Sequence, residues 1–274
     1  MDNVVIASSE ADIKAAEAVE HHHAQMAGAL AVRVEALVAA ASAGDRARAE
    51  DARAELVGWC EQDLVPHALA EESAMYPAAR AKVEGKLLVD GMLEEHKVIT
   101  GLVQLLAATE DPVRAAAGAK ALQVAFENHL AKENGLVLPL LVAAPEVSVA
   151  QLLGGMHELL GGDGHAESHG RAAAHGRPAE EGGGEGHHCN CGEEDGVGYP
   201  ELDARAVPHA IRHATIFGAL DAVRPGTGMV LVAPHDPLPL LKQVEDRSPG
   251  TFEVSYLERG PEAWRLAFVR RPAA

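Results

Sequence analysis

The chain has 274 residues, enough for one large domain or two ordinary ones. Its 23 Lys and Arg face 41 Asp and Glu, and the formal charge of -18 argues against nucleic acid and anionic membranes as partners. Three Cys are too few for a disulfide framework. The first residues lack the pattern of a signal peptide, and no apolar run approaches the roughly 20 residues of a membrane span, so we expect a soluble cytoplasmic protein.

The first 160 residues carry a helical pattern. Ala, Leu and Glu dominate, and apolar residues recur at three- and four-residue steps in four long stretches and one short one: about 10–42, 46–77, 86–107, 112–141 and 148–160. Asp45 and the pair Asp111-Pro112 are expected to begin the second and fourth helices, and Pro66 to kink the second. Four long helices on short loops predict an all-α, antiparallel four-helix bundle over residues 1–160.

One pattern in this region occurs twice. The segments His67-Ala-Leu-Ala-Glu71 and His129-Leu-Ala-Lys-Glu133 each place a His four residues before a Glu, and in both a proline follows ten residues after the His. On a helix, the two side chains of each copy share one face, about 6 Å apart along the axis. Two such helices facing each other predict a mixed nitrogen and oxygen cage, which suits iron or another divalent transition metal.

The other two long helices show a weaker repeat. They align as His23-x4-Gly28 and His96-x4-Gly101, so that every helix of the bundle carries a His. A run of three His in the first helix leaves the choice between His22 and His23 open, and the alignment favours His23.

The alternative interpretation is that these His are ordinary core residues, since most single His on an apolar helix face are core residues and not metal ligands. Four of them, one on each helix, together with the buried Glu71 and Glu133, would be costly to bury without a cation. A ferritin-like di-iron bundle needs Glu-x-x-His on two helices, and only Glu20-His23 has that spacing here. The sequence therefore favours a His-rich cage with two carboxylates.

With His67-x3-Glu71, His96 and His129-x3-Glu133, residues 10–160 resemble the hemerythrin-like (HHE cation-binding) family. The resemblance implies a non-haem di-iron centre in which Glu71 and Glu133 bridge the metals, with zinc or manganese less suited. The terminal ligands that it implies are His23 (or His22), His67, His96 and His129. The oxygen-carrying hemerythrins have a second His one turn after the first in their third helix, where this chain has Thr100. Reversible oxygen carriage is therefore not implied.

The resemblance implies a binding or sensing function. Oxygen, peroxide or nitric oxide would bind at the iron, and the C-terminal part of the chain would relay the response to a protein partner. Two alternatives remain open: a di-iron enzyme that turns over peroxide or oxidises ferrous iron, and a metal storage module.

From residue 161 to 199 the composition changes to Gly, His, Glu and Ala, which predicts a disordered linker. Its cluster His187-His188-Cys189-Asn190-Cys191 lacks the second ligand pair of a convincing zinc site, so we expect loose metal binding or a passive linker. Cys60, in the second helix, is expected to be a small core residue.

Residues 200–274 have the pattern of a second domain. Short apolar runs alternate with two amphipathic stretches in the order βαβαββ: 202–206, 208–223, 229–233, 237–246, 252–257 and 264–269. This order predicts a small two-layer α/β domain. The pattern around Arg212-His213 and His235-Asp236 resembles a family of uncharacterised domains appended to hemerythrin-like bundles, which itself is similar to the TusA/SirA sulfur-carrier fold. Val207-Pro208 stands where those carriers have Cys-Pro, so persulfide transfer is not implied.

Arg212, His213, His235 and Asp236 are candidates for an anion site or a protein-partner site, because ligands often bind at strand ends and helix starts in α/β layers. Their alternative role is that of capping and surface groups.

Overall fold

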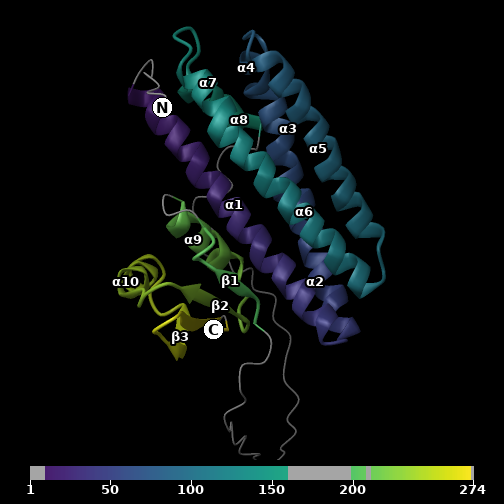
Figure 1. Ribbon diagram of the computed structural model, residues 1–274, viewed down its shortest axis with the longest axis vertical. Coiled ribbons are helices and arrows are strands. Elements are labelled where there is room, and N and C mark those ends of the chain that lie inside the picture. Colours follow the sequence, from purple (N-terminus) through teal and green to yellow (C-terminus); the bar gives the residue numbers. More distant parts are fainter. Residues whose placement is uncertain (1–9, 160–198, 208–210, 273–274) are drawn as a thin grey trace, which may run out of the picture.

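The computed structural model describes residues 10–159, 199–207 and 211–272 (Figure 1). The linker predicted for 161–199, with its His and Cys cluster, lies outside these residues except for Tyr199.

Four long helical segments form the predicted antiparallel bundle, and each begins and ends within a few residues of its expected bounds. The first is α1 (Glu10–Ser42), and the third is α5 (Gly85–Ala108). The second and fourth are interrupted by short π-helical turns. The second consists of α2 (Arg46–Trp59), η1 (Cys60–Leu64) and α3 (Val65–Ala74). The fourth consists of α6 (Pro112–Lys132), η2 (Glu133–Val137) and α7 (Leu138–Val142). Two short helices complete the bundle: α4 (Tyr76–Arg80) and α8 (Val149–Leu159).

The predicted caps are in place. The side chain of Asp45 accepts a hydrogen bond from the backbone N–H of Arg48 at 3.1 Å, and Asp111 accepts one from Arg114 at 2.8 Å. Each satisfies one of the free N–H groups at the start of its helix.

The interruptions η1 and η2 are π-helical turns placed directly before a proline. The N–H of Val65 bonds to the carbonyl of Cys60, and the N–H of Leu138 bonds to that of Glu133, five residues back in both cases. Pro66 and Pro139 follow, and neither can donate the next bond of an α-helix. The distortion expected at Pro66 is thus a π-turn that lets the helix continue, and it recurs in the fourth helix.

Two separate apolar clusters fill the bundle. One gathers residues such as Leu30, Leu56 and Phe126, and the other gathers residues such as Val19 and Met92. The buried His and Glu side chains fall between the two clusters along every helix. His96, for example, lies between Met92 and Ile99, which belong to different clusters. The core is therefore divided by a polar layer.

The C-terminal domain has the predicted βαβαββ order. Its four-stranded sheet has the strand order β1-β2-β4-β3, in which β1 (Glu201–Asp203) runs parallel to β2 (Gly228–Ala233) and the pairs of β4 (Trp264–Arg270) with β2 and β3 (Phe252–Arg259) are antiparallel. The crossover helices are α9 (Arg212–Ala222) and α10 (Leu238–Arg247). They share one apolar cluster with sheet residues such as Leu231 and Phe268.

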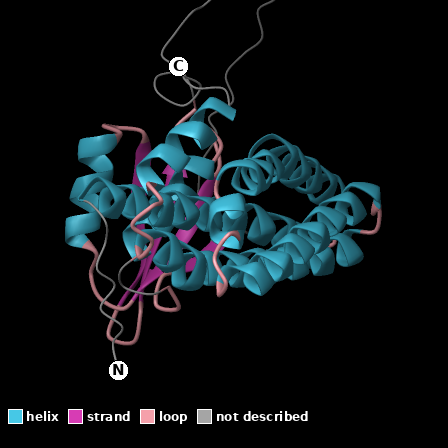
Figure 2. Ribbon diagram, turned by 90° about the horizontal axis from the view of Figure 1, so that it is seen from above, coloured by secondary structure: helices cyan, strands magenta, loops and turns pink. Residues whose placement is uncertain are grey.

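The C-terminal domain packs directly on α1, so the two domains lie side by side (Figure 2). Ala31 and Val32 of α1 belong to the apolar cluster of the C-terminal domain. The backbones of α1 and α9 meet at two glycines. A Cβ atom on Gly28 would lie 2.0 Å from the carbonyl oxygen of Thr215, and one on Gly218 would lie 2.1 Å from that of Gln25. Only glycine permits so close an approach.

The helix α1 is long and apolar enough to cross a membrane by length and composition, because an 18-residue window within its 33 residues has a mean hydropathy of 1.4. This corrects the expectation that no apolar run approaches that length. Half of the window (50%) is buried inside the protein, as in a helix that packs on the bundle on one side and on α9 on the other. Both contacts account for the apolar composition.

Candidate metal centre

Six predicted side chains meet in the polar layer of the bundle. The exposed fractions are 0% for His23, 4% for His67, 4% for His96, 1% for His129, 1% for Glu71 and 0% for Glu133. They come from all four segments: α1, α3, α5 and the junction of α6 with η2. The extra residue of η1 precedes His67 and sets the face on which His67 projects relative to α2, since one added residue rotates the rest of a helix by about 100°. Glu133 begins η2 and keeps the α-helical relation to His129, because its N–H bonds to the His129 carbonyl.

These side chains form two groups that share one carboxylate. Potential ligand atoms of His23, His67 and Glu71 lie within 4.8 Å of one another, and so do those of Glu71, His96 and His129. The Oε1 atom of Glu71 is 2.8 Å from His67 Nε2 and 3.2 Å from His23 Nε2, while its Oε2 atom is 3.7 Å from His96 Nε2. Glu71 therefore faces both groups.

Glu133 also lies between the groups. Its Oε2 atom is 3.8 Å from His23 Nε2 and 3.6 Å from His129 Nε2. The arrangement therefore has two carboxylates, each near His residues of both groups.

Several buried atoms in this layer are left without hydrogen bonds. His67 Nε2 lies 2.8 Å from Glu71 Oε1, yet it has no hydrogen-bond partner among the described residues, and neither has Glu133 Oε2. The His67 nitrogen and the Glu71 oxygen are thus close enough to bond, but their geometry does not form a hydrogen bond. Buried polar atoms are rarely left so, and the donor set fits a metal cation that these atoms would share.

Outer acceptors orient three of the imidazoles. The Nδ1–H of His23 donates to Asn134 Oδ1 at 2.7 Å, that of His96 to Glu72 Oε1 at 2.7 Å, and that of His129 to Glu95 Oε2 at 3.1 Å. Each bond leaves the Nε2 lone pair free to face the centre of the layer. Carboxylates or amides behind metal-bound imidazoles commonly have this function.

The electrostatics of the layer also favour a cation. Burial, followed by the charge of Glu71, raises the pKa of Glu133 well above 4.5. Burial also opposes the ionisation of Glu71, but His67 and His23 outweigh it and hold the pKa of Glu71 well below its usual value. Burial, followed by the adjacent His96, lowers the pKa of His129 from 6.5 to about 4, so this imidazole is neutral, the form that binds metals.

The sequence analysis missed one residue of the layer, Tyr76. It is 2% exposed, and its hydroxyl donates to Glu133 Oε1 at 2.7 Å. Burial, followed by the charges of Glu133 and Glu71, raises the pKa of this phenol. The repeat gave no signal for it, because Leu138 stands at the corresponding position before Pro139.

His22, the second choice for the first helix, is exposed and lies outside the layer. Its ring centroid is 5.1 Å from that of His67. The structure therefore brings His23, the first choice, to the other predicted ligands.

Three of the four residues singled out in the C-terminal domain line a common cavity of about 90 Å³: Arg212, His213 and His235. It lies where β1 and β2 end and α9 begins. Arg212 also donates two hydrogen bonds to the carbonyl of Val207, a residue that precedes α9, at 2.8 and 3.1 Å. The fourth residue, Asp236, does not line the cavity and accepts a hydrogen bond from Tyr256 at 2.8 Å instead.

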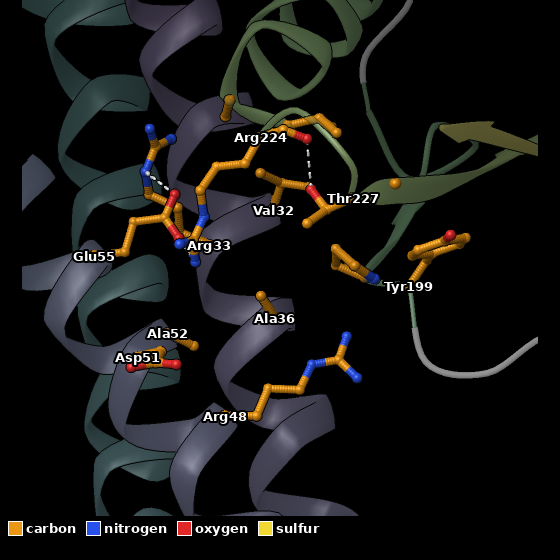
Figure 3. Close-up of a pocket in the computed structure, with 14 residues that line it drawn as sticks. Val32, Arg33, Ala36, Arg48, Asp51, Ala52, Glu55, Tyr199, Arg224 and Thr227 are labelled. Atoms are coloured by element: carbon orange, nitrogen blue, oxygen red, sulfur yellow. Dashed lines mark hydrogen bonds and ion pairs between the residues drawn. The ribbon is translucent and has the colours of Figure 1, made fainter. Parts of the chain in front are cut away.

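A larger cavity of about 230 Å³ lies at the seam between the domains (Figure 3). On one side, Glu55 of α2 faces Arg33 of α1 at 4.0 Å and also forms an ion pair with Arg224 of the C-terminal domain. Arg48 and Tyr199 lie along the other sides. Glu55 thus adds an ion pair between the domains to the apolar contact of α1 with α9.

Cys60 is fully buried in the apolar core, and burial raises its pKa to about 12, which confirms its predicted structural role.

Comparisons with known proteins agree with this geometry. Residues 14–141 match the family model described as "Hemerythrin HHE cation binding domain", and residues 201–270 match the one described as "Uncharacterized conserved protein (DUF2249)". No curated protein and no solved structure is significantly similar to the chain. The similarity of the second domain to the TusA/SirA fold stays a prediction. Residues 14–141 therefore form a hemerythrin HHE cation-binding domain, which the chain carries together with a C-terminal DUF2249 domain.

Proposed function

We propose that the bundle holds a non-haem di-iron centre, which binds oxygen, peroxide or nitric oxide for sensing or for a stress response. The observation that carries this proposal is the position of Glu71, whose carboxylate is within reach of both His groups. Six buried nitrogen and oxygen donors suit iron better than zinc, which favours four ligands in closed sites.

In this proposal, His23 and His67 would hold one metal and His96 and His129 the other, with Glu71 and Glu133 within reach of both. Iron would supply an exchangeable coordination position and a change of oxidation state. The residues of the chain contribute orientation, through Asn134, Glu72 and Glu95 behind the imidazoles, and exclusion of water, through the apolar clusters on both sides.

The contact of α1 with α9 suggests how the C-terminal domain takes part. His23 faces the centre, and Gln25, two residues later, contacts Gly218 of α9. A small shift of His23 on ligand binding would therefore be passed to the C-terminal domain, which we propose as the surface for a protein partner. We expect the protein to act in the cytoplasm.

Metal analysis of protein prepared without a His-tag tests the ligand assignment. His67→Ala and His129→Ala should each lower the iron content and destabilise the bundle, because each leaves a buried carboxylate partly uncompensated. His21→Ala, at an exposed position of the same His run, is the matched control and should change neither quantity. If both buried variants kept full metal and full stability, the assignment would be wrong.

Two further measurements separate the competing functions. Loss of peroxide, or oxidation of ferrous iron, in large excess over protein would make the centre an enzyme, whereas a stoichiometric and reversible spectral change supports binding. Deletion of residues 161–198 should leave most of the metal bound. Loss of most metal on that deletion would instead support a storage function of the His-rich segment.

A further inference from the structure

The hydroxyl of Tyr76 is close to three of the atoms assigned to the metal centre. Tyr76 Oη is 2.7 Å from Glu133 Oε1, 3.3 Å from His96 Nε2 and 3.3 Å from His129 Nε2. The two His Nε2 atoms are themselves 3.0 Å apart. All four atoms are buried, so water does not compete for these contacts.

These separations match the edges of one coordination sphere. Adjacent ligands of an octahedral metal with bonds of about 2.1 Å stand about 3.0 Å apart. The Nε2 atoms of His96 and His129 have this spacing, and Tyr76 Oη lies at nearly the same distance from both of them. The phenolic oxygen therefore occupies the place of a third ligand beside the two imidazoles.

The ring of Tyr76 is held in this position. It stacks on the imidazole of His96 with ring centroids 5.4 Å apart and an interplanar angle of 18°. Tyr76 begins α4, next to Pro77, and its side chain belongs to one of the two apolar clusters of the bundle. This packing holds the ring and keeps the hydroxyl beside the two imidazoles.

We propose that Tyr76 is a ligand of the metal held by His96 and His129, bound through its phenolate oxygen. Its hydroxyl proton passes along the existing hydrogen bond to Glu133 and from there to solvent as the cation binds. This inference rests on the proposed di-iron function. It makes the two metals inequivalent, because Tyr76 is the only tyrosine in the first 198 residues and the pair His23 and His67 has no equivalent of it. The anionic oxygen stabilises the ferric state at one iron only.

The alternative is that Tyr76 remains a phenol and only donates a hydrogen bond to Glu133. The absorption spectrum of the iron-loaded, oxidised full-length chain distinguishes the two, since a phenolate bound to ferric iron has a charge-transfer band in the visible region, whereas imidazole and carboxylate ligands absorb at shorter wavelengths. We expect the wild-type chain to show this band, and Tyr76→Phe to lose it while keeping its iron. Tyr199→Phe, which alters an exposed tyrosine, is the control and should keep the band.

Resonance Raman scattering excited in the visible band gives a second test that needs no variant, because only a bound phenolate contributes enhanced ring modes. This test holds even if Tyr76→Phe fails to fold. A wild-type chain that binds about two irons without a visible phenolate band, or a Tyr76→Phe chain that keeps the band, overturns the proposal and leaves the di-iron centre intact. A wild-type chain that binds no iron overturns the di-iron function itself.

Discussion

The contact between the two domains gives a sharp prediction, because the internal repeat supplies its own control. Gly28 and Gly101 follow His23 and His96 by five residues in α1 and α5. A Cβ atom on Gly28 would lie 2.0 Å from the carbonyl oxygen of Thr215, whereas a Cβ atom on Gly101 would meet no atom within 4 Å. The same substitution therefore has opposite consequences at the two positions.

In Gly28→Ala, α9 must move away from α1 by about 1 Å, since the clashing atoms belong to the backbone and no side-chain rotation relieves them. Overpacking of this kind costs about 3 kcal/mol, and the gain in helix propensity returns about 1 kcal/mol, so the free energy of unfolding should fall by about 2 kcal/mol. Gly101→Ala has the gain in helix propensity without the overpacking cost, so it should stabilise the protein by up to about 1 kcal/mol.

Urea denaturation followed by Trp fluorescence measures both variants, since Trp59 lies in the bundle and Trp264 in the C-terminal sheet. Equal stability of Gly28→Ala and Gly101→Ala would refute the close docking of α9 on α1.

Three other predictions concern the buried groups. In the metal-free protein, Glu133 has a raised pKa, so its protonated form stabilises the folded chain. This contribution to the free energy of unfolding is complete below pH 4.5 and is lost as the pH rises, by up to about 1.4 kcal/mol per pH unit. In urea denaturation, Glu133→Gln should therefore be as stable as the wild type near pH 4 and more stable than it near pH 8. A stability difference that does not change with pH would contradict this pH dependence. Glu95→Ala removes the acceptor behind His129 and should weaken metal binding by roughly 10- to 100-fold in a chelator competition, while an unchanged affinity would count against that orienting function. Cys60, buried and with a pKa of about 12, should resist thiol reagents at neutral pH until the chain unfolds, as peptide mapping of the labelled protein can show.

Much of the bundle could be predicted from the sequence, because its signals are local. Asp45 and Asp111 cap their helices through their own side chains, and the three- and four-residue steps of apolar residues follow the helix surface. The distortion at Pro66 was expected from the missing N–H, although its form as a π-turn depends on the whole helix continuing beyond it. The order of the C-terminal elements was predicted for the same local reasons.

The features that the sequence analysis missed depend on contacts between distant segments. Tyr76 enters the polar layer because α4 packs beside α5, and a tyrosine next to a proline gives no sign of this. In the sequence, Gly28 was only one member of a repeat, whereas Thr215, whose backbone it contacts, lies almost two hundred residues later. Asp236 was grouped with His235 by adjacency, but in the turn after β2 only His235 lines the cavity, and Asp236 bonds to Tyr256 instead.

The presence of two cations between the four His and two Glu is tested most directly by metal analysis of the untagged full-length chain, loaded with iron and freed of loosely bound metal by a chelator. We predict about two irons per chain, both lost together in Glu71→Ala, because this carboxylate faces both groups of ligands. A chain that retains no metal, or that keeps both irons when Glu71 is replaced, would contradict the shared centre.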